Sequence, residues 1–370
     1  MDSWPSVAKG VLQPDDRSPE TQALLRAWLA VQRCFGLHPQ RVCEELRRDP
    51  DPRRLLRGAG GLPSEAELDR AVCALRSTRT VAVPIGSSAY PARLERLTDA
   101  PPLLLLRGDV RIPSRPCVAI VGARAATVYG LDAAKHFASE LASAGVVIVS
   151  GLAVGIDAAA HRAALEVGGT TLAVQACGPD RVYPARHRRL ADDIAKAGGV
   201  LTEFFPGTRP RPAFFPLRNR LISALSVAVL VVEARERSGS LLTAGHAANQ
   251  GVDVFAVPGP ISAPTSRGTN RLLRDGAGVA LEASDILAAL GVAGVVPKPG
   301  AVVEAWTDEQ NRILRTLERE SQSRDELARQ LGRTPEQLAL GLAELELSGR
   351  VSQDRDGRLC VVSPPEVPEL

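Results

Sequence analysis

The chain has 370 residues, of which 45% are hydrophobic and 24% charged, and its formal net charge is +3. This composition excludes an intrinsically disordered chain and leaves room for two or three globular domains. No apolar run reaches the roughly 18–20 residues that span a bilayer, so we expect no membrane segment.

Residues 1–19 lack the apolar segment of a signal peptide and are expected to form a polar, flexible leader. The six cysteines are scattered, and none forms a C-x-x-C pair. This pattern is typical of reduced thiols in a cytoplasmic protein. Cysteines and histidines never cluster at the spacing of a zinc site, so no bound metal is expected.

Residues 20–80 are predicted to form a small helical domain. In TQALLRAWLAVQRCFGL the apolar residues recur at helical spacing. Two shorter helices are expected around 39–47 and 64–76, after which the pattern changes. The residues alone favour a packing module.

Residues 81–292 have the pattern of an α/β domain. Nearly continuous apolar runs indicate strands buried on both faces. Helical stretches lie between many of them, so we expect a Rossmann-like core with an extended parallel sheet and helices on both faces. The predicted strands are TVAVPI, PLLLLRG, CVAIVGA, VVIVSG, TLAVQAC, VLTEF, VAVLVVEA and VDVFAVPG.

The Gly-, Val- and Pro-rich residues 293–304 are predicted to be a linker. Residues 305–364 then show helices followed by a hairpin, the order of a winged helix-turn-helix domain. Thr334 is a candidate helix cap, and Asp356-Gly357 a candidate hairpin turn. The segment holds eleven acidic residues and nine arginines. Because a reader of duplex DNA should be basic, we expect this domain to make protein contacts instead.

Four loops that follow predicted strands carry glycine, and three of them also carry arginine, serine or threonine. They are GARAATVYG, GLAVGIDAAAH, RERSGSLLTAGHA and PISAPTSRGTNRLL. The carboxyl ends of parallel strands meet at one edge, where glycines and helix N-termini accommodate anions. Together these loops predict a pocket for phosphates, although each glycine alone fits a tight turn as well.

The first loop begins like a dinucleotide-binding turn but lacks its glycine fingerprint. Gly122 ends the strand, and Arg124 stands in the turn itself. A dinucleotide site needs several glycines so that the pyrophosphate can approach bare backbone. An arginine here suits a longer polyanion and disfavours an NAD-dependent oxidoreductase.

Asp157 and His161 lie four residues apart on a predicted helix, a spacing that suits two metal ligands. No third ligand is visible in the sequence. A capping aspartate and a hydrogen-bonded core histidine are therefore the favoured interpretation.

The stretch FFPGTRPRPAFFPLRNRLISALSVAVLVV contains no acidic residue. Its four arginines, Arg209, Arg211, Arg218 and Arg220, fall close to Phe214 and Phe215. Arginine forks bind phosphates, and an aromatic face stacks on any base. The composition fits a single-strand nucleic-acid site, and equally a loop with core phenylalanines and solvated arginines.

The order of these motifs resembles the DNA-processing protein A family (DprA, also called Smf). The resemblance covers roughly residues 85–290 and implies a sterile-alpha-motif-like N-terminal domain, a Rossmann-like core and a winged helix. The segments that carry it are SAYPARLERLTDAPPLLLLRG, GARAATVYG, SGLAVGIDAAAH, YPARHRRL, FPLRNRLISALS, EARERSGSLLTAGHAA, VFAVPG and GTNRLL.

The resemblance implies a protein that binds single-stranded DNA with little sequence preference during natural transformation and recombination. Such a protein protects the strand and loads the RecA recombinase onto it. The resemblance also implies a homodimer through the Rossmann-like domain, with no cofactor and no catalytic residue.

Carried over by motif, Arg124 is implied to be the principal phosphate contact and Phe215 to stack on a base. The other DNA-binding residues implied by the resemblance are Gly122, Ala123, Gly151, Arg211, Arg218, Asn219, Arg220, Ser238, Gly239, Ser240 and Thr243. Four positions depart from the family pattern: Ala123, Pro212, His187 and Asp253. None of these changes removes the site arginines, so we expect binding to persist.

An alternative function is nucleotide binding, or release of the base from a nucleoside monophosphate on a similar core. Enzymes of that kind carry P-G-G-x-G-T-x-x-E with a catalytic glutamate. The corresponding turn, RSGSLLTAGHA, has no glutamate after Thr243 until Glu282. This difference favours a binding protein that is not an enzyme.

Overall fold

The computed structural model falls into two compact units, residues 1–300 and 301–370, which are described separately. The residues that it describes are 10–48, 51–57, 59–290, 308–317, 320–334, 337–339, 341–342, 345, 351–353 and 358–361. The predicted linker, most of the expected leader's first half and the Asp356-Gly357 turn lie outside these residues.

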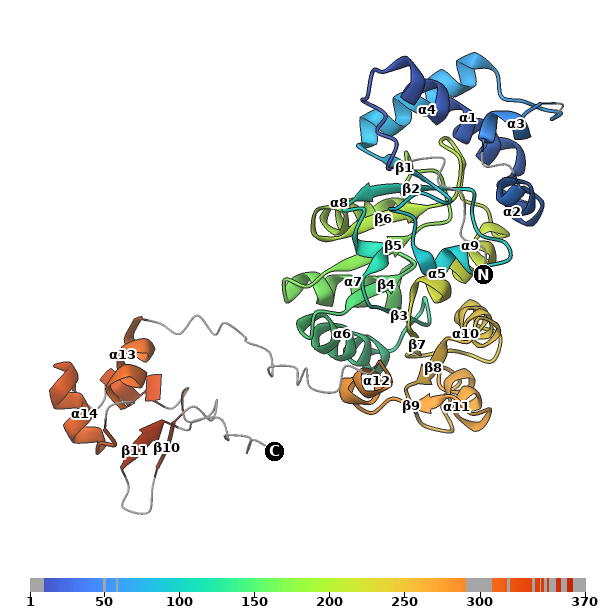
Figure 1. Cartoon of the computed structure of the whole chain (residues 1–370). Helices are drawn as coiled ribbons and strands as arrows, with labels where there is room; N and C mark the ends of the chain where they lie inside the picture. The colour runs from blue at the N-terminus through green and yellow to red at the C-terminus, as the bar shows by residue number, and fades with distance from the viewer. Residues whose placement is uncertain are drawn as a thin grey trace. The chain divides into compact units, whose positions relative to one another are not determined.

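The first unit is built on a nine-stranded sheet with the order β1-β2-β6-β5-β4-β3-β7-β8-β9 (Figure 1). All eight predicted strands are present, and the two-residue β9 is the one that the sequence pattern did not reveal. The strands are β1 Val81–Pro84, β2 Leu103–Gly108, β3 Cys117–Val121, β4 Val147–Ser150, β5 Thr171–Val174, β6 Gly199–Thr202, β7 Ala228–Val231, β8 Asp253–Ala256 and β9 Gly278–Val279.

The strands from β6 to β9 are parallel, which confirms the α/β fold class. The sheet is not parallel throughout, because at one edge β1 pairs antiparallel with β2, and β2 with β6. A parallel connection needs a crossover of a dozen or more residues, usually a full helix. The 18 residues between β1 and β2 contain only the four-residue helix α5 and no full crossover helix, and the chain returns beside β1.

Helices cover both faces of the sheet because alternate strand residues point to opposite sides. Val118 and Ile120 pack with α6, α7 and α12, whereas Ala119 and Val121 belong to the core that includes α9 and α10. The helices of this layered part are α5 Ala92–Glu95, α6 Val128–Ser143, α7 Ile156–Glu166, α8 Arg188–Ala197, α9 Phe214–Leu225, α10 Gly239–Asn249, α11 Arg267–Arg274 and α12 Ala283–Ala289, with short 3₁₀ turns at Ile112–Ser114 and Ala185–His187.

The N-terminal helices lie against the β1–β2 edge of the sheet (Figure 1). Trp28 and Leu29 of α1 share one hydrophobic core with Leu104 and Leu106 of β2. Gln32 is buried, and its amide donates a hydrogen bond to the carbonyl of Glu203 at 2.7 Å, which fixes α1 to the end of β6. These helices are α1 Pro19–Phe35, α2 Pro39–Arg48, α3 Pro52–Leu55 and α4 Glu65–Thr78.

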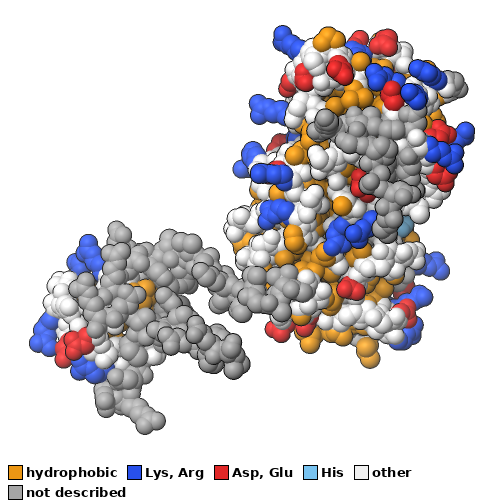
Figure 2. All heavy atoms as spheres, viewed as in Figure 1, with side chains coloured by type: hydrophobic (Ala, Val, Ile, Leu, Met, Phe, Trp, Pro, Cys, Tyr) orange, Lys and Arg blue, Asp and Glu red, His pale blue; other side chains and the backbone are white. Residues whose placement is uncertain are grey.

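The outer surface of the N-terminal helices mixes opposite charges, as Figure 2 shows at the top of the first unit. Arg33 pairs with Glu67 at 2.9 Å, and Arg26 pairs with Glu65 at 3.2 Å. None of the helices in the described part of the chain is both long and apolar enough to cross a membrane.

The second unit has the winged-helix order. Ile313, Leu314 and Leu317 belong to its hydrophobic core, and Thr334 and Gln337 exchange the hydrogen bonds of a capping box. The helix that follows is described only in part. The described elements are α13 Asp308–Leu317, α14 Arg324–Leu331, β10 Val351–Gln353 and β11 Leu359–Val361, and the last two pair antiparallel.

Candidate nucleic-acid interface

The sheet reverses its strand order between β3 and β7, so the crevice at their carboxyl ends is the natural ligand position. The loop after β3 begins at Gly122, where a Cβ would lie 2.7 Å from the side chain of Ile156. Gly155 has φ +79°, and a Cβ there would lie 2.2 Å from the carbonyl oxygen of Ala123. The absence of a side chain at Gly122 and Gly155 therefore allows the loops after β3 and β4 to pack closely against each other.

Glu233, at the end of β7, fixes the loop that carries Arg124. The Glu233 carboxylate accepts hydrogen bonds from the Thr127 backbone N–H at 2.9 Å and from its hydroxyl at 2.7 Å. The Thr127 hydroxyl in turn caps α6 by accepting from Gly130 N at 3.1 Å. Glu233 is only 2% exposed, so this clamp is shielded from solvent.

Arg124 is exposed, and its guanidinium lies over the ring of Phe215, with Cζ 4.9 Å from the ring centroid. Phe215 sits in the first turn of α9 and also contacts the ring of Tyr183, at a centroid distance of 5.6 Å. The cation and the aromatic ring are thus in direct contact at the same point of the pocket. This arrangement can receive a phosphate and a base of the same nucleotide.

Arg218 forms the floor of the crevice rather than its rim. The residue is only 4% exposed, and its guanidinium donates to the carbonyl of Val174. Burial lowers the pKa of Arg218 to about 10, and the neighbouring Asp157 acts in the opposite direction. Arg218 remains a cation at neutral pH and adds positive charge to the floor of the crevice.

The residues around this crevice enclose a pocket of about 790 Å³. Among its lining residues there are five arginines and one carboxylate, Asp157, which accepts hydrogen bonds from Gly151 N and Ala153 N. Eleven of the thirteen predicted site residues line the pocket: Gly122, Ala123, Arg124, Arg211, Phe215, Arg218, Asn219, Ser238, Gly239, Ser240 and Thr243.

The other two predicted residues, Gly151 and Arg220, do not line this pocket. Arg220 is buried and forms ion pairs with Asp99 at 3.0 Å and with Glu203, so it does not shape the pocket. Gly151 is also buried; a Cβ there would clash with the guanidinium of Arg218, so the glycine makes room for that arginine. Both residues support the fold beneath the site.

The other lining residues include one aromatic and two basic side chains that were not among the predicted site residues: Tyr183, Arg235 and Arg237. Tyr183 belongs to the YPARHRRL motif and is 45% exposed. Arg235 and Arg237 belong to the loop after β7, in which only the serines and glycine were singled out. Both are exposed in the structure, and their basic charge was the signal visible in RERSGS.

The loop after β7, which carries Ser238 and Ser240, is held in place by local hydrogen bonds. Ser238 caps α10, and its hydroxyl lies 2.7 Å from that of Ser240. Asn219 reaches across from α9 and donates to the carbonyl of Gly239 at 3.3 Å. The N-terminus of α10 therefore faces the pocket with its favourable dipole.

Asp157 and His161 have structural partners, as the favoured interpretation expected. Asp157 closes the loop after β4, and burial raises the pKa of its carboxyl. His161 Nδ1 lies 2.7 Å from the Thr171 hydroxyl. In the described part of the chain, no three His, Cys, Asp or Glu side chains are grouped so that they could hold a metal ion.

A family model for DNA recombination-mediator protein A matches residues 81–291, and one for the DprA winged helix domain matches 297–357. Protein Smf of Escherichia coli is 38% identical over 294 residues, which cover 77% of this chain and 78% of that protein.

Two solved structures share the fold. DNA processing protein A from Streptococcus pneumoniae has a TM-score of 0.59 and 34% identity, covering 72% of this chain and 94% of that one. DNA processing protein A from Helicobacter pylori has a TM-score of 0.53 and 31% identity, covering 58% and 96%. The latter structure concerns the single-stranded DNA binding mode of the Helicobacter protein.

Proposed function

The chain belongs to the DNA recombination-mediator protein A family, and on that premise we propose that its pocket binds single-stranded DNA with little sequence preference. The observation that carries the proposal is the exposed Arg124 guanidinium over the Phe215 ring. It stands in a pocket with five arginines and one carboxylate. Phosphate contacts and base stacking do not read base edges, so sequence preference is weak.

The single-strand binding described for the Helicobacter protein supports the same ligand here. The two chains share the fold, and in this chain the loop after β3 lies at the switch point of the sheet. An extended strand, rather than a lone phosphate, explains why cations are spread over several loops.

Further parts of the proposal rest on family membership. The protein protects incoming strands in natural transformation and recombination, and loads the RecA recombinase onto them. It acts in the cytoplasm as a homodimer joined through the Rossmann-like domain. Sedimentation of the purified chain tests the dimer, and RecA ATPase activity on single strands coated with single-strand-binding protein tests the loading.

We propose a binding protein rather than an enzyme. The alternative, base release from a nucleoside monophosphate, would need a carboxylate in the pocket. Among the described lining residues Asp157 is the only one, and two backbone amides already hold its Oδ2. No observation favours the alternative.

A titration of labelled oligothymidylate, followed by fluorescence anisotropy, tests the binding proposal. Arg124→Ala is expected to weaken binding roughly tenfold or more and to reduce the salt slope by about 0.7, because one phosphate contact is lost. Arg162→Ala, on the exposed surface of α7 and outside the pocket, is the matched control. Equal affinities for the wild type and Arg124→Ala would refute the proposal.

A further inference from the structure

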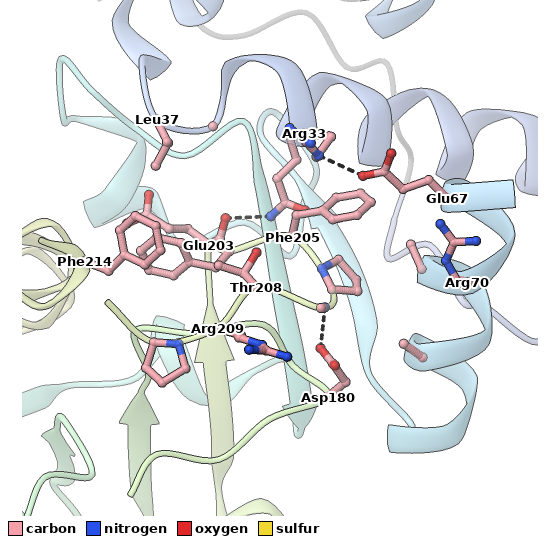
Figure 3. A pocket seen from close by; sticks show the side chains of 18 of the residues that line it. Arg33, Leu37, Glu67, Arg70, Asp180, Glu203, Phe205, Thr208, Arg209 and Phe214 are labelled. Carbon is pink, nitrogen blue, oxygen red and sulfur yellow. Dashed lines mark hydrogen bonds and ion pairs between the residues drawn. The ribbon is translucent and has the colours of Figure 1, made fainter. Parts of the chain in front are cut away.

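A second groove, of about 980 Å³, lies between the N-terminal helices and the chain that follows β6. Figure 3 shows Arg33, Glu67 and Arg70 of the helices on one side. Phe205 and Arg209 come from the loop that faces them. The groove is therefore assembled from segments well over a hundred positions apart in the sequence.

The two sides of this groove are held in place. The buried Gln32 of α1 donates to the carbonyl of Glu203 at 2.7 Å. On the loop side, the Asp180 carboxylate accepts from Gly207 N at 2.7 Å. A ligand would find the surface preformed and would not have to order it.

The groove carries an excess of positive charge. Each of its three carboxylates already has a basic partner: Glu67 pairs with Arg33 at 2.9 Å, Asp180 with Arg181 at 3.6 Å, and Glu203 with Arg220. Three exposed arginines line it, and none of them forms an ion pair with another described residue: Arg70, Arg209 and Arg211.

This second groove adjoins the Arg124 pocket. Pro210 and Arg211 line both. The Arg211 guanidinium lies 5.9 Å from the centroid of the Phe214 ring, which lines the second groove, while Phe215 lines the Arg124 pocket. Phe214 and Phe215, which are adjacent at the start of α9, therefore line the second groove and the Arg124 pocket respectively.

We propose that a single DNA strand leaving the Arg124 pocket continues into this second groove, so that the N-terminal helices contribute directly to DNA binding. The inference rests on the proposed function of the pocket. Arg70 and Arg209 contact backbone phosphates from opposite sides, and the half-buried Phe205 ring offers a face to a base. A duplex cannot use that face, because its bases are stacked inside the helix.

The test compares a short oligothymidylate of about 5 nucleotides, which fills the Arg124 pocket, with one of about 16 that can reach the second groove. The variant is the full chain carrying Arg70→Ala and Arg209→Ala. A charge-matched control carries Arg162→Ala and Arg189→Ala, two exposed arginines that line neither hollow. Thermal unfolding verifies that both variants are folded.

The double variant is expected to bind the long strand roughly tenfold more weakly than the control, with a salt slope lower by about 1.4, because two phosphate contacts are lost. Its affinity for the short strand should equal that of the control. Equal affinity for the long strand would overturn the inference and leave the pocket intact as the binding site. If the double variant lost affinity for both the short and the long strand, that result would also overturn the inference.

A wild-type chain that binds neither length would instead refute the proposed function itself. An independent measurement is photo-crosslinking from a 5-iodouracil placed near one end of the long strand. Crosslinked peptides are expected to contain residues 204–211 or 67–74, and crosslinks confined to other segments would contradict the path.

Discussion

Arg124 and Phe215 meet across the crevice of the sheet, with the guanidinium 4.9 Å from the ring centroid. One residue comes from the loop after β3 and the other from the first turn of α9, more than ninety positions later in the chain. The contact presents a cation and an aromatic face to the same nucleotide. It is the central feature of the proposed DNA site.

Phe215→Leu should separate stacking from charge. Leucine keeps an apolar side chain but has no π-face, so the loss is expected to be about 1–2 kcal/mol of binding free energy. The salt dependence should stay unchanged, because no phosphate contact is removed. Anisotropy titrations at several salt concentrations measure both quantities, and a changed slope would argue against stacking.

Arg220→Ala should affect stability and not the chemistry of the pocket. The arginine is 6% exposed and pairs with Asp99 and Glu203, and its removal leaves the buried Glu203 without its cation. Breaking such a buried pair costs roughly 3–5 kcal/mol of unfolding free energy. Urea denaturation measures this loss of stability. The variant that remains folded should bind oligothymidylate as the wild type does. Selective loss of binding would restore Arg220 to the site.

His161 should make the fold sensitive to acid. The Thr171 hydroxyl donates to the carbonyl of Ile148, so it accepts from His161 Nδ1–H, and the buried Nε2 carries no proton. Burial lowers the pKa of His161 to about 3, below the usual 6.5. Between these values the unfolded chain binds a proton that the folded chain does not, so stability falls as the pH falls.

This contribution amounts to about 1.4 kcal/mol of unfolding free energy per pH unit below about 6.5. Urea denaturation of the wild type and His161→Gln across that range isolates it, since the other titrating groups are common to both. Parallel curves for the two proteins would show that the histidine is protonated in the folded state.

Deletion of residues 305–370 should leave single-strand affinity within about twofold of the full chain. The first unit has its own hydrophobic cores, and the deleted segment contains more acidic residues than arginines. Anisotropy with the same oligonucleotide compares the two proteins. A large loss would assign DNA contacts to the winged helix, whereas unchanged affinity agrees with a role in protein contacts.

The strands and the converging loops were predictable because buried parallel strands read as continuous apolar runs, and their carboxyl ends meet at one edge. Most of the residues that line the pocket were named from motifs in the loops after these strands, and these loops meet at that same edge. The antiparallel edge was not predictable from strand patterns, because an apolar run carries no direction.

Arg220 does not line the pocket, and the reason is geometric. Arg218 and Arg220 are two residues apart on α9, and such positions point about 200° apart around a helix. The pocket uses Phe215, Arg218, Asn219 and Ile222, the spacing of a single helix face. A helical reading of FFPLRNRLISAL would have separated the two arginines, which the motif had grouped.

The most direct test of the DNA-binding account is competition for the pocket. A labelled oligothymidylate bound to the full chain is displaced by unlabelled single strand, by duplex of the same length, or by nucleoside monophosphates. We expect the single strand to compete at concentrations at least about tenfold lower than the other two, because only it offers phosphates and accessible base faces together. A nucleoside monophosphate that competes as well as the strand would contradict the account and favour a nucleotide site.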